Sequence, residues 1–317
     1  MIRPFDWRDL PTLHRYRQQG LCLDSALGLT RGPTLSPSVL LSYLTPTTGF
    51  FTWVNPDEEQ PILGQLSHQS MSPYARVSFL APEKAIKRAE TKEMLDYLSQ
   101  QAGRRGATHL LAEIDEFAPA FEVLRRAGYG IFARQRIWKV RGVTPNKLPQ
   151  VQWRAVKDQD IISVQSLFHN IVPGLVGQVE PLDAKNLQGL VCYQGHELAG
   201  YVSLVYGHRG IWAQPFFHPD VDNVSDQLQG MIYSIPDRRS RPIYICVRTY
   251  QSWLEPSLSA MDTQPSPLQA VMVKRLAICQ KVTRKALPNM EGQQEMTAPL
   301  AQARRKDELV VEGDLRR

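Results

Sequence analysis

Four side chains stand out among those that could accept or donate protons in an enzyme site. Glu113 lies in the apolar run HLLAEI, and a carboxylate on such a strand can act as a general base where it faces a cleft. Glu83, His68 and His218 stand in or beside other apolar runs. Each has a structural alternative: an exposed strand position for Glu113 and His68, and a turn position for Glu83 and His218. We take Glu113 as the candidate base.

Other common catalytic and metal-binding patterns are missing from the sequence. The four cysteines, at 22, 192, 246 and 279, are far apart, so no CxxC pair exists for a metal or redox site. Metal-ligand spacings, P-loops and GxSxG turns are also missing. We therefore predict no metal site. The cysteines are isolated, which favours a reducing, cytoplasmic compartment. The start shows no signal-peptide pattern, and no apolar run of about 18 residues occurs, so a membrane span is not expected.

The composition and charge are those of an ordinary globular protein. The 317 residues are long enough for two domains, and 43% of them are hydrophobic. The formal net charge is +6, from 37 Lys+Arg and 31 Asp+Glu, and the cations are scattered along the chain. Nucleic-acid-binding proteins usually gather their basic residues on one face, so a nucleic-acid partner is not expected.

The sequence pattern occurs twice along the chain. Residues 2–16 and 153–168 each predict a short strand, a turn and the start of a helix. Both copies place an arginine six residues before an aspartate: Arg3 and Asp9 in one, Arg154 and Asp160 in the other. Three further matches keep a nearly constant offset: Gly64 with Gly200, Leu124 with Leu258, and Trp138 with Val273, at 136, 134 and 135 positions.

Each half is expected to contain the same strands and a central helix. Gly64 and Gly200 each interrupt an apolar strand, which indicates a bulge or a close backbone approach. Each half is expected to close with one more strand of its own. The predicted elements are strands at 61–69, 76–83, 109–114 and 132–140 with a helix at 86–103, and strands at 196–206, 210–220, 242–247 and 268–276 with a helix around 228–235.

The two halves define the predicted domains. We place the first at residues 1–143 and the second at 151–280, with a linker near 141–152 that contains two prolines and a glycine. Residues 287–317 have no aromatic side chains and are rich in charged and polar types, so we predict a disordered tail.

The order of strands and helices resembles the GNAT (GCN5-related N-acetyltransferase) superfamily over residues 2–140 and again over 152–276. The resemblance implies an α/β fold with a mixed sheet, present in two tandem copies. In that family the fourth strand separates from the fifth, and the gap exposes backbone groups to the pantetheine arm of acetyl-CoA. The following loop binds the pyrophosphate at the N-terminus of a helix, where unpaired N–H groups favour an anion.

The resemblance places the cofactor in the first half. The strand backbone that faces pantetheine corresponds to Ser78, Phe79 and Leu80. The pyrophosphate loop corresponds to Lys87, Arg88, Ala89, Glu90, Thr91 and Lys92, with Ala89 and Thr91 at the family's glycine positions. The equivalent loop of the second half, at 220–226, holds three aspartates and should repel phosphate.

A second motif of the family begins with an asparagine and ends with a tyrosine that often serves as general acid. The asparagine position is Phe117 in the first half and Gln251 in the second. The tyrosine position is Leu124 in the first half and Leu258 in the second. Any proton donor for the departing thiolate must therefore come from elsewhere.

The resemblance implies an acetyl-CoA-dependent N-acyltransferase that acts on a primary amine of a small molecule or peptide. Glu113 is then the base, and acetyl-CoA is the acyl donor. Two alternatives remain open: a catalytically inactive module that senses an acyl-CoA or binds a protein partner, and an aminoacyl transferase on the same fold. The acceptor and the oligomeric state do not follow from the sequence.

Overall fold

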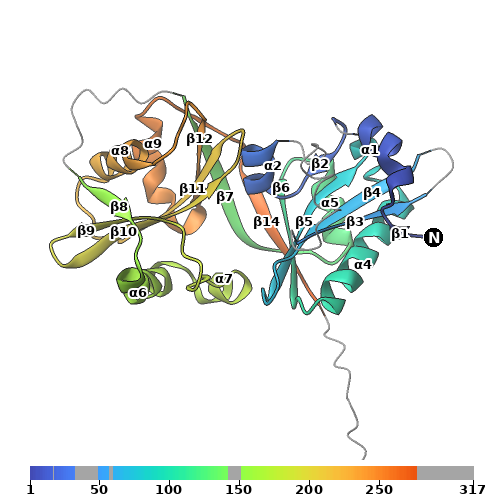
Figure 1. Ribbon diagram of the computed structural model, residues 1–317, viewed down its shortest axis with the longest axis horizontal. Helices are drawn as coiled ribbons and strands as arrows, with labels where there is room; N and C mark the ends of the chain where they lie inside the picture. The colour runs from blue at the N-terminus through green and yellow to red at the C-terminus, as the bar shows by residue number, and fades with distance from the viewer. Residues whose placement is uncertain (17, 33–48, 57–59, 142–150, 277–317) are drawn as a thin grey trace, which may run out of the picture. The chain divides into compact units, whose positions relative to one another are not determined.

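The computed structural model describes residues 1–16, 18–32, 49–56, 60–141 and 151–276, all of which fall within the compact unit Met1–Cys279 (Figure 1). The predicted tail at 287–317 and most of the predicted linker lie outside these residues. The described elements of the first half are β1 (Arg3–Pro4), η1 (Trp7–Asp9), α1 (Leu10–Tyr16), β2 (Leu21–Cys22), α2 (Ser25–Arg31), β3 (Phe50–Asn55), β4 (Ile62–Ser67), β5 (Tyr74–Ala81), η3 (Glu83–Ala85), α4 (Ala89–Arg104), β6 (His109–Asp115), α5 (Pro119–Arg126) and β7 (Gly130–Val140).

The described second half repeats the main order of strands and helices, without a counterpart of β2 and with an additional short strand, β13. This repeat confirms the predicted duplication and the α/β class. Its elements are β8 (Trp153–Ala155), η4 (Asp158–Asp160), α6 (Ile161–Ile171), α7 (Gly174–Val179), β9 (Gly189–Gln194), β10 (Glu197–Tyr206), β11 (Ile211–Phe217), α8 (Val224–Ser234), β12 (Ile243–Arg248), η5 (Thr249–Leu254), α9 (Glu255–Ser259), β13 (Thr263–Pro265) and β14 (Gln269–Arg275). Among the described residues, no helix is long and apolar enough to cross a membrane.

The arginine–aspartate pair that marks the start of each repeat has the same geometry in both halves. Arg3 donates to both carboxylate oxygens of Asp9 at 2.7 Å, and Arg154 does the same to Asp160. In each half the aspartate also accepts a backbone N–H three residues earlier, at 2.8 Å. The sequence match between these pairs therefore reflects one conserved local structure that fixes the first strand to the first helical turn.

Replacing Asp160 by asparagine is expected to destabilise the protein by about 2 kcal/mol at neutral pH, since charged hydrogen bonds to a buried group are lost. Arg154, together with Tyr193 and a backbone N–H, holds the pKa of Asp160 well below its usual value. A lowered pKa means that the stabilisation is present above the unfolded value near 4 and disappears as pH falls through the folded pKa. Urea unfolding at pH 7 and pH 3 measures both effects. Exposed Asp158→Asn serves as the control, and equal losses at the two pH values would contradict the prediction.

The two strand glycines allow a neighbour to approach the strand closely, as predicted. A Cβ on Gly64 would lie 2.9 Å from the side chain of Met94 on α4. A Cβ on Gly200 would lie 2.9 Å from the ring of Trp153 and 3.0 Å from that of Phe217. Both strands therefore need a residue without a side chain at this position.

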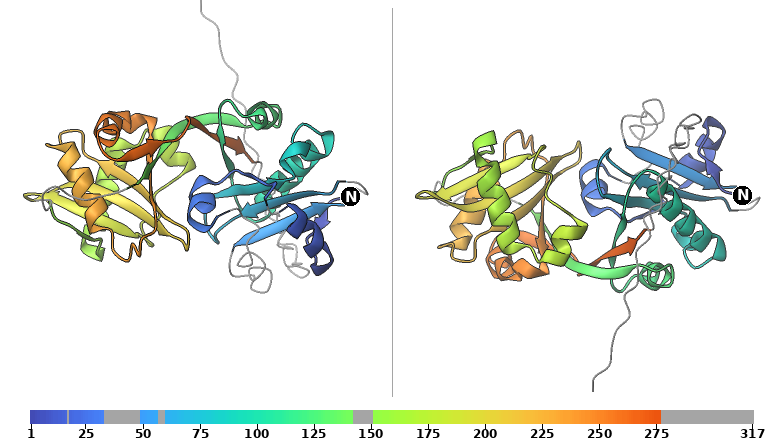
Figure 2. Two further views of the ribbon diagram at one scale, coloured as in Figure 1. Left: turned by 90° about the horizontal axis from the view of Figure 1, so that it is seen from above. Right: turned by 90° about the horizontal axis from the view of Figure 1, so that it is seen from below.

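The last strand of each repeat does not close its own half, contrary to the prediction. The order of hydrogen-bonded strands is β1-β3-β4-β5-β6-β14-β7-β12-β11-β10-β9-β8, with β2 paired to β5 and β13 to β7. Strand β14, orange-red in Figure 2, runs between β6 and β7 of the first half. The far part of β7 pairs with β12 of the second half. Ala270 and Met272 of β14 consequently belong to the core of the first half.

Candidate functional site

The gap between β5 and β6, where the family resemblance places pantetheine, holds a segment of this chain. The two strands pair in parallel from Tyr74 to Arg76 and then separate. Strand β2 pairs antiparallel with Phe79 and Leu80 inside the gap. Just beyond it, Leu23 donates its N–H to Ser78 O at 3.0 Å and accepts the Glu113 N–H at 2.8 Å.

The predicted pantetheine-facing backbone is thus engaged by the protein itself. Leu23 is 1% exposed, so its side chain is part of the core and the segment is firmly packed. The Glu83 N–H at the end of β5 is also bonded to the Gln19 carbonyl. As described, Ser78, Phe79 and Leu80 do not fit a pantetheine arm unless residues 19–24 leave the gap.

The predicted pyrophosphate loop and the residues just before it form tight turns in which several backbone N–H groups are already bonded. Ala85, Ile86, Arg88 and Thr91 each donate their backbone N–H to a carbonyl three residues earlier. The buried Thr91 hydroxyl donates to Ala85 O at 2.7 Å, and the Arg88 side chain pairs with Glu90 at 3.2 Å. Lys87, Ala89 and Lys92 lie in the same turn and helix start. An arginine already paired with a carboxylate offers little net charge to a diphosphate.

The gap of the second half is bridged by one side-chain amide. Strands β11 and β12 pair in parallel from Ile211 to Ala213 and then separate. Gln251 donates Nε2–H to Pro215 O at 2.9 Å and accepts the Phe217 N–H at 2.9 Å. Because Gln251 is 1% exposed, its amide replaces solvent or ligand on the β11 backbone. The sequence placed Gln251 at the motif's first position but did not predict this contact.

Glu113 belongs to a charge cluster formed by Arg76, Glu113, Glu180 and Arg248, in which Glu113 and Arg248 are buried and the other two are partly buried. Arg76 Nη1 donates to Glu113 at 2.8 Å, and Arg76 Nη2 donates to Glu180. Glu180 also accepts from Arg248 Nη2 at 2.9 Å. The cluster joins β5 and β6 of the first half to α7 and β12 of the second.

The surroundings of Glu113 hold its carboxylate in the charged form. Its second oxygen accepts the Ser25 N–H and a Gln135 side-chain N–H, both at 3.0 Å. Burial alone would raise the pKa of Glu113, but Arg76, Arg248 and the Ser25 N–H outweigh it and lower the pKa. Because a general base works best with a pKa near the operating pH, this arrangement favours an anchoring role for Glu113.

Two cavities adjoin the cluster, and we call them the central cavities. Their volumes are about 500 and 510 Å³, and both are lined by Arg76, Arg248 and Gln214. His68 lines one of them, and its ring Nε2 lies 3.0 Å from Ser72 O. The residue is 8% exposed, so the prediction of an exposed position for His68 is wrong. The other central cavity has a wall of apolar side chains from α6, α7 and β11.

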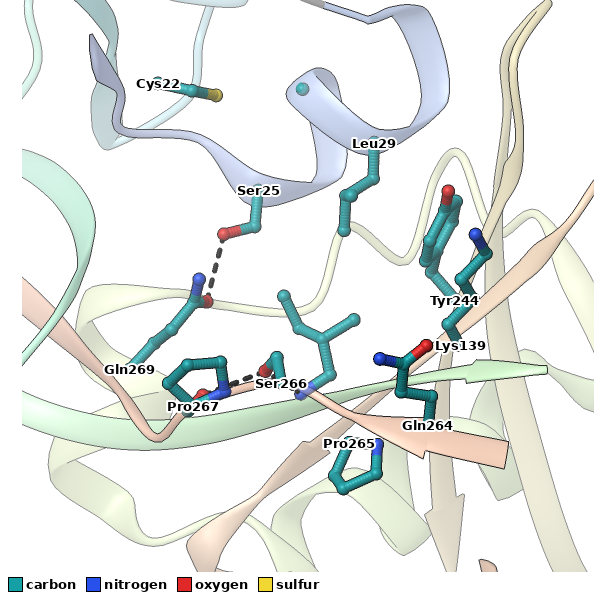
Figure 3. Close-up of a pocket in the computed structure, with 12 residues that line it drawn as sticks. Cys22, Ser25, Leu29, Lys139, Tyr244, Gln264, Pro265, Ser266, Pro267 and Gln269 are labelled. Carbon is teal, nitrogen blue, oxygen red and sulfur yellow. Dashed lines mark hydrogen bonds between the residues drawn. The ribbon is translucent and has the colours of Figure 1, made fainter. Parts of the chain in front are cut away.

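A third cavity, of about 620 Å³, lies where α2 faces β7 and the chain leading into β14 (Figure 3). The Ser25 hydroxyl and Gln135 Nε2 both donate to Gln269 Oε1 at 3.0 Å. Lys139 and Tyr244 occupy paired positions on β7 and β12 and lie side by side at one end (Figure 3). The two hydrogen bonds to Gln269 tie the start of β14 to α2 and β7.

The remaining candidates for chemistry take structural positions. His218 accepts the Asp220 N–H at 3.3 Å and Glu83 opens η3, which confirms the turn positions considered for them. Burial raises the pKa of the Cys22 and Cys246 thiols to about 12, so thiolate chemistry is unfavourable there. Within the described ranges, no group of His, Cys, Asp and Glu side chains is arranged to hold a metal ion.

Sequence reasoning missed three members of the charge cluster. Arg76 and Arg248 each stand in a strand, where a single charge is typical of an exposed position. Glu180 follows a short helix. The sequence did hold one signal for Arg248, which is a charged residue next to an apolar run. It directly follows IYICV, and Glu113 likewise stands within the run HLLAEI.

Comparisons with solved structures identify the fold. The chain is similar to a GCN5-related N-acetyltransferase from Sphaerobacter thermophilus, with a TM-score of 0.55, 11% identity, and coverage of 87% of this chain and 95% of that one. It is also similar to a tandem GNAT protein from the clavulanic acid biosynthesis pathway, with a TM-score of 0.51, 14% identity, and coverage of 87% and 98%. No protein-family model and no curated protein sequence matches the chain. The chain therefore has the tandem GNAT fold that the sequence resemblance implied.

Proposed function

We propose that this protein uses the duplicated GNAT fold as a ligand-binding module and does not turn over acetyl-CoA. The observation that carries the proposal is that both strand gaps are occupied by the chain itself. Residues 19–24 engage the β5 backbone in the first half, and the Gln251 amide engages the β11 backbone in the second. A pantetheine arm would have to break these buried hydrogen bonds before making its own.

The central cavities support a binding role. They lie beside the charge cluster, and each has a volume within the range that small-molecule sites occupy. Residues from both halves line them, so the duplication itself creates the site. In a transferase of this fold, by contrast, the reactive centre would lie at a strand gap.

An acetyl-CoA-dependent N-acyltransferase that acts on a primary amine is the second candidate. The feature in its favour is that β5 separates from β6, and β11 from β12, as the family's strand gap requires. For this activity, residues 19–24 or the Gln251 side chain would have to leave the gap. Arg88 would then be expected to contact the diphosphate.

Calorimetric titration with acetyl-CoA separates the two candidates. We expect no saturable heat from the wild-type protein up to about 1 mM ligand. The Arg88→Glu variant should behave in the same way. Micromolar binding that Arg88→Glu weakens, together with thioester loss when amines are added, would instead establish the transferase. Binding without thioester loss would identify an acyl-CoA sensor and remove the claim that the gaps are closed.

A further inference from the structure

Arg248 is a buried cation whose hydrogen bonds are only partly made. Its side chain is 4% exposed and donates from Nη2 to Glu180. Nε and Nη1, which together carry three N–H groups, have no partner among the described residues. Buried donors of this kind cost free energy unless an acceptor reaches them. An arginine with unpaired N–H groups beside a cavity therefore indicates a site for an acceptor.

Both central cavities reach this arginine. Arg248 lines each of them, as do Arg76 and Gln214, and the two volumes of about 500 and 510 Å³ leave room for more than a single water molecule. The unpaired donors are themselves buried, so a small turn of the Arg248 side chain into a cavity that it lines brings them to an acceptor there.

The charges around Arg248 argue against an anionic ligand. The two arginines and two glutamates of the charge cluster balance one another. Buried Asp24, whose pKa is raised by burial and by Glu113 against the lowering effect of Arg76, adds a negative charge whenever it is ionised. In the cavity of about 510 Å³, which we call the second central cavity, Arg76 and Arg248 are matched by the carboxylates of Glu180 and Asp183. A carboxylate or phosphate would meet no surplus positive charge there, whereas an uncharged oxygen acceptor meets no such penalty.

Part of the lining of the second central cavity is apolar. Phe168, Val172 and Val176 line it from α6 and α7, and Leu187 and Phe216 complete it. These side chains belong to, or pack against, one hydrophobic cluster of the second half. The lining of this cavity thus combines an apolar surface with an arginine that has unpaired N–H donors.

We propose that the second central cavity binds a small uncharged amide or carbonyl compound, with its oxygen on Arg248 and its apolar body against Phe168 and Leu187. This inference rests on the proposed binding role and names the class of ligand. The Arg248 donors supply orientation, and the aromatic and aliphatic wall supplies most of the buried contact area.

The test uses N-acetyl-phenylalaninamide as the amide probe and 3-phenylpropionate as a carboxylate with a similar apolar body. Each is titrated into the full-length protein while arginine Nε–H resonances are followed by NMR. The Arg248 resonance is assigned by its loss in Arg248→Lys. We expect a saturable shift with the amide and at least about tenfold weaker binding of the carboxylate.

A pair of variants checks the location. Leu187→Trp places a bulkier side chain in the second central cavity and should weaken amide binding by about tenfold or more, whereas Ile162→Trp on exposed α6 surface should leave it unchanged. If Arg248→Lys does not fold, the location of the site is decided by this pair of variants alone, in a thermal-shift titration with the amide probe. No saturable response, equal effects of the two variants, or tighter carboxylate binding would overturn the inference. The acetyl-CoA titration is a separate measurement, so the failure of one proposal is distinguishable from that of the other.

Discussion

A chain that ends at residue 267 is expected to lose the cooperative folding of its first half, although that half is complete in sequence. Strand β14 supplies the ladder between β6 and β7, and Ala270, Val271 and Met272 are fully buried there. Burial of Val271 and Met272 alone contributes about 3–6 kcal/mol. That is comparable to the total stability of many domains, about 5–15 kcal/mol.

Hydrogen exchange measures this loss strand by strand. Amides of β6 should lose protection in the chain that ends at 267 and keep it in a chain that ends at 276, which retains β14. Adding a synthetic peptide of residues 267–276 should restore part of the protection. Full protection of β6 in the shorter chain would show that the exchanged strand is dispensable for the first half.

Local patterns in the sequence predicted the elements well but not the partners of the strands. The helix at α4 follows from the spacing of Met94, Leu95 and Leu98, and the strand glycines follow from their apolar neighbours. The position of β14 depends instead on pairing with a strand about 160 residues earlier, for which one sequence holds no local signal.

The occupied gaps were missed for a related reason. Strand β2 has two residues, too few for any period-2 pattern to be visible. Gln251 is an ordinary polar residue in the sequence, and only the separated strands around it reveal that its amide bonds the β11 backbone. Glu113 was found as a candidate because it interrupts an apolar run. Its partner Arg76, and Glu180 and Arg248 that complete the charge cluster, come from distant segments.

Replacing Glu113 by alanine is expected to lower the free energy of unfolding by about 3–5 kcal/mol, because Arg76 and Gln135 lose a buried partner. The Glu113 side chain is 3% exposed and that of Arg76 is 21% exposed, so solvent screens the pair only weakly. Glu122→Ala is the matched control. Its carboxylate pairs with Arg125 at 3.2 Å but is 57% exposed, and the expected loss is below about 1 kcal/mol.

The pH dependence distinguishes an ion pair from simple loss of packing. Since the folded pKa of Glu113 is lowered, its contribution is present above the unfolded value near 4.3 and is lost as pH falls through the folded value. The difference in urea stability between wild type and Glu113→Ala should therefore be largest near pH 7 and shrink below about pH 4. A difference that stays constant from pH 7 to pH 3 would mean that the carboxylate is not the stabilising group. Glu113 would then be open again to the role of a base.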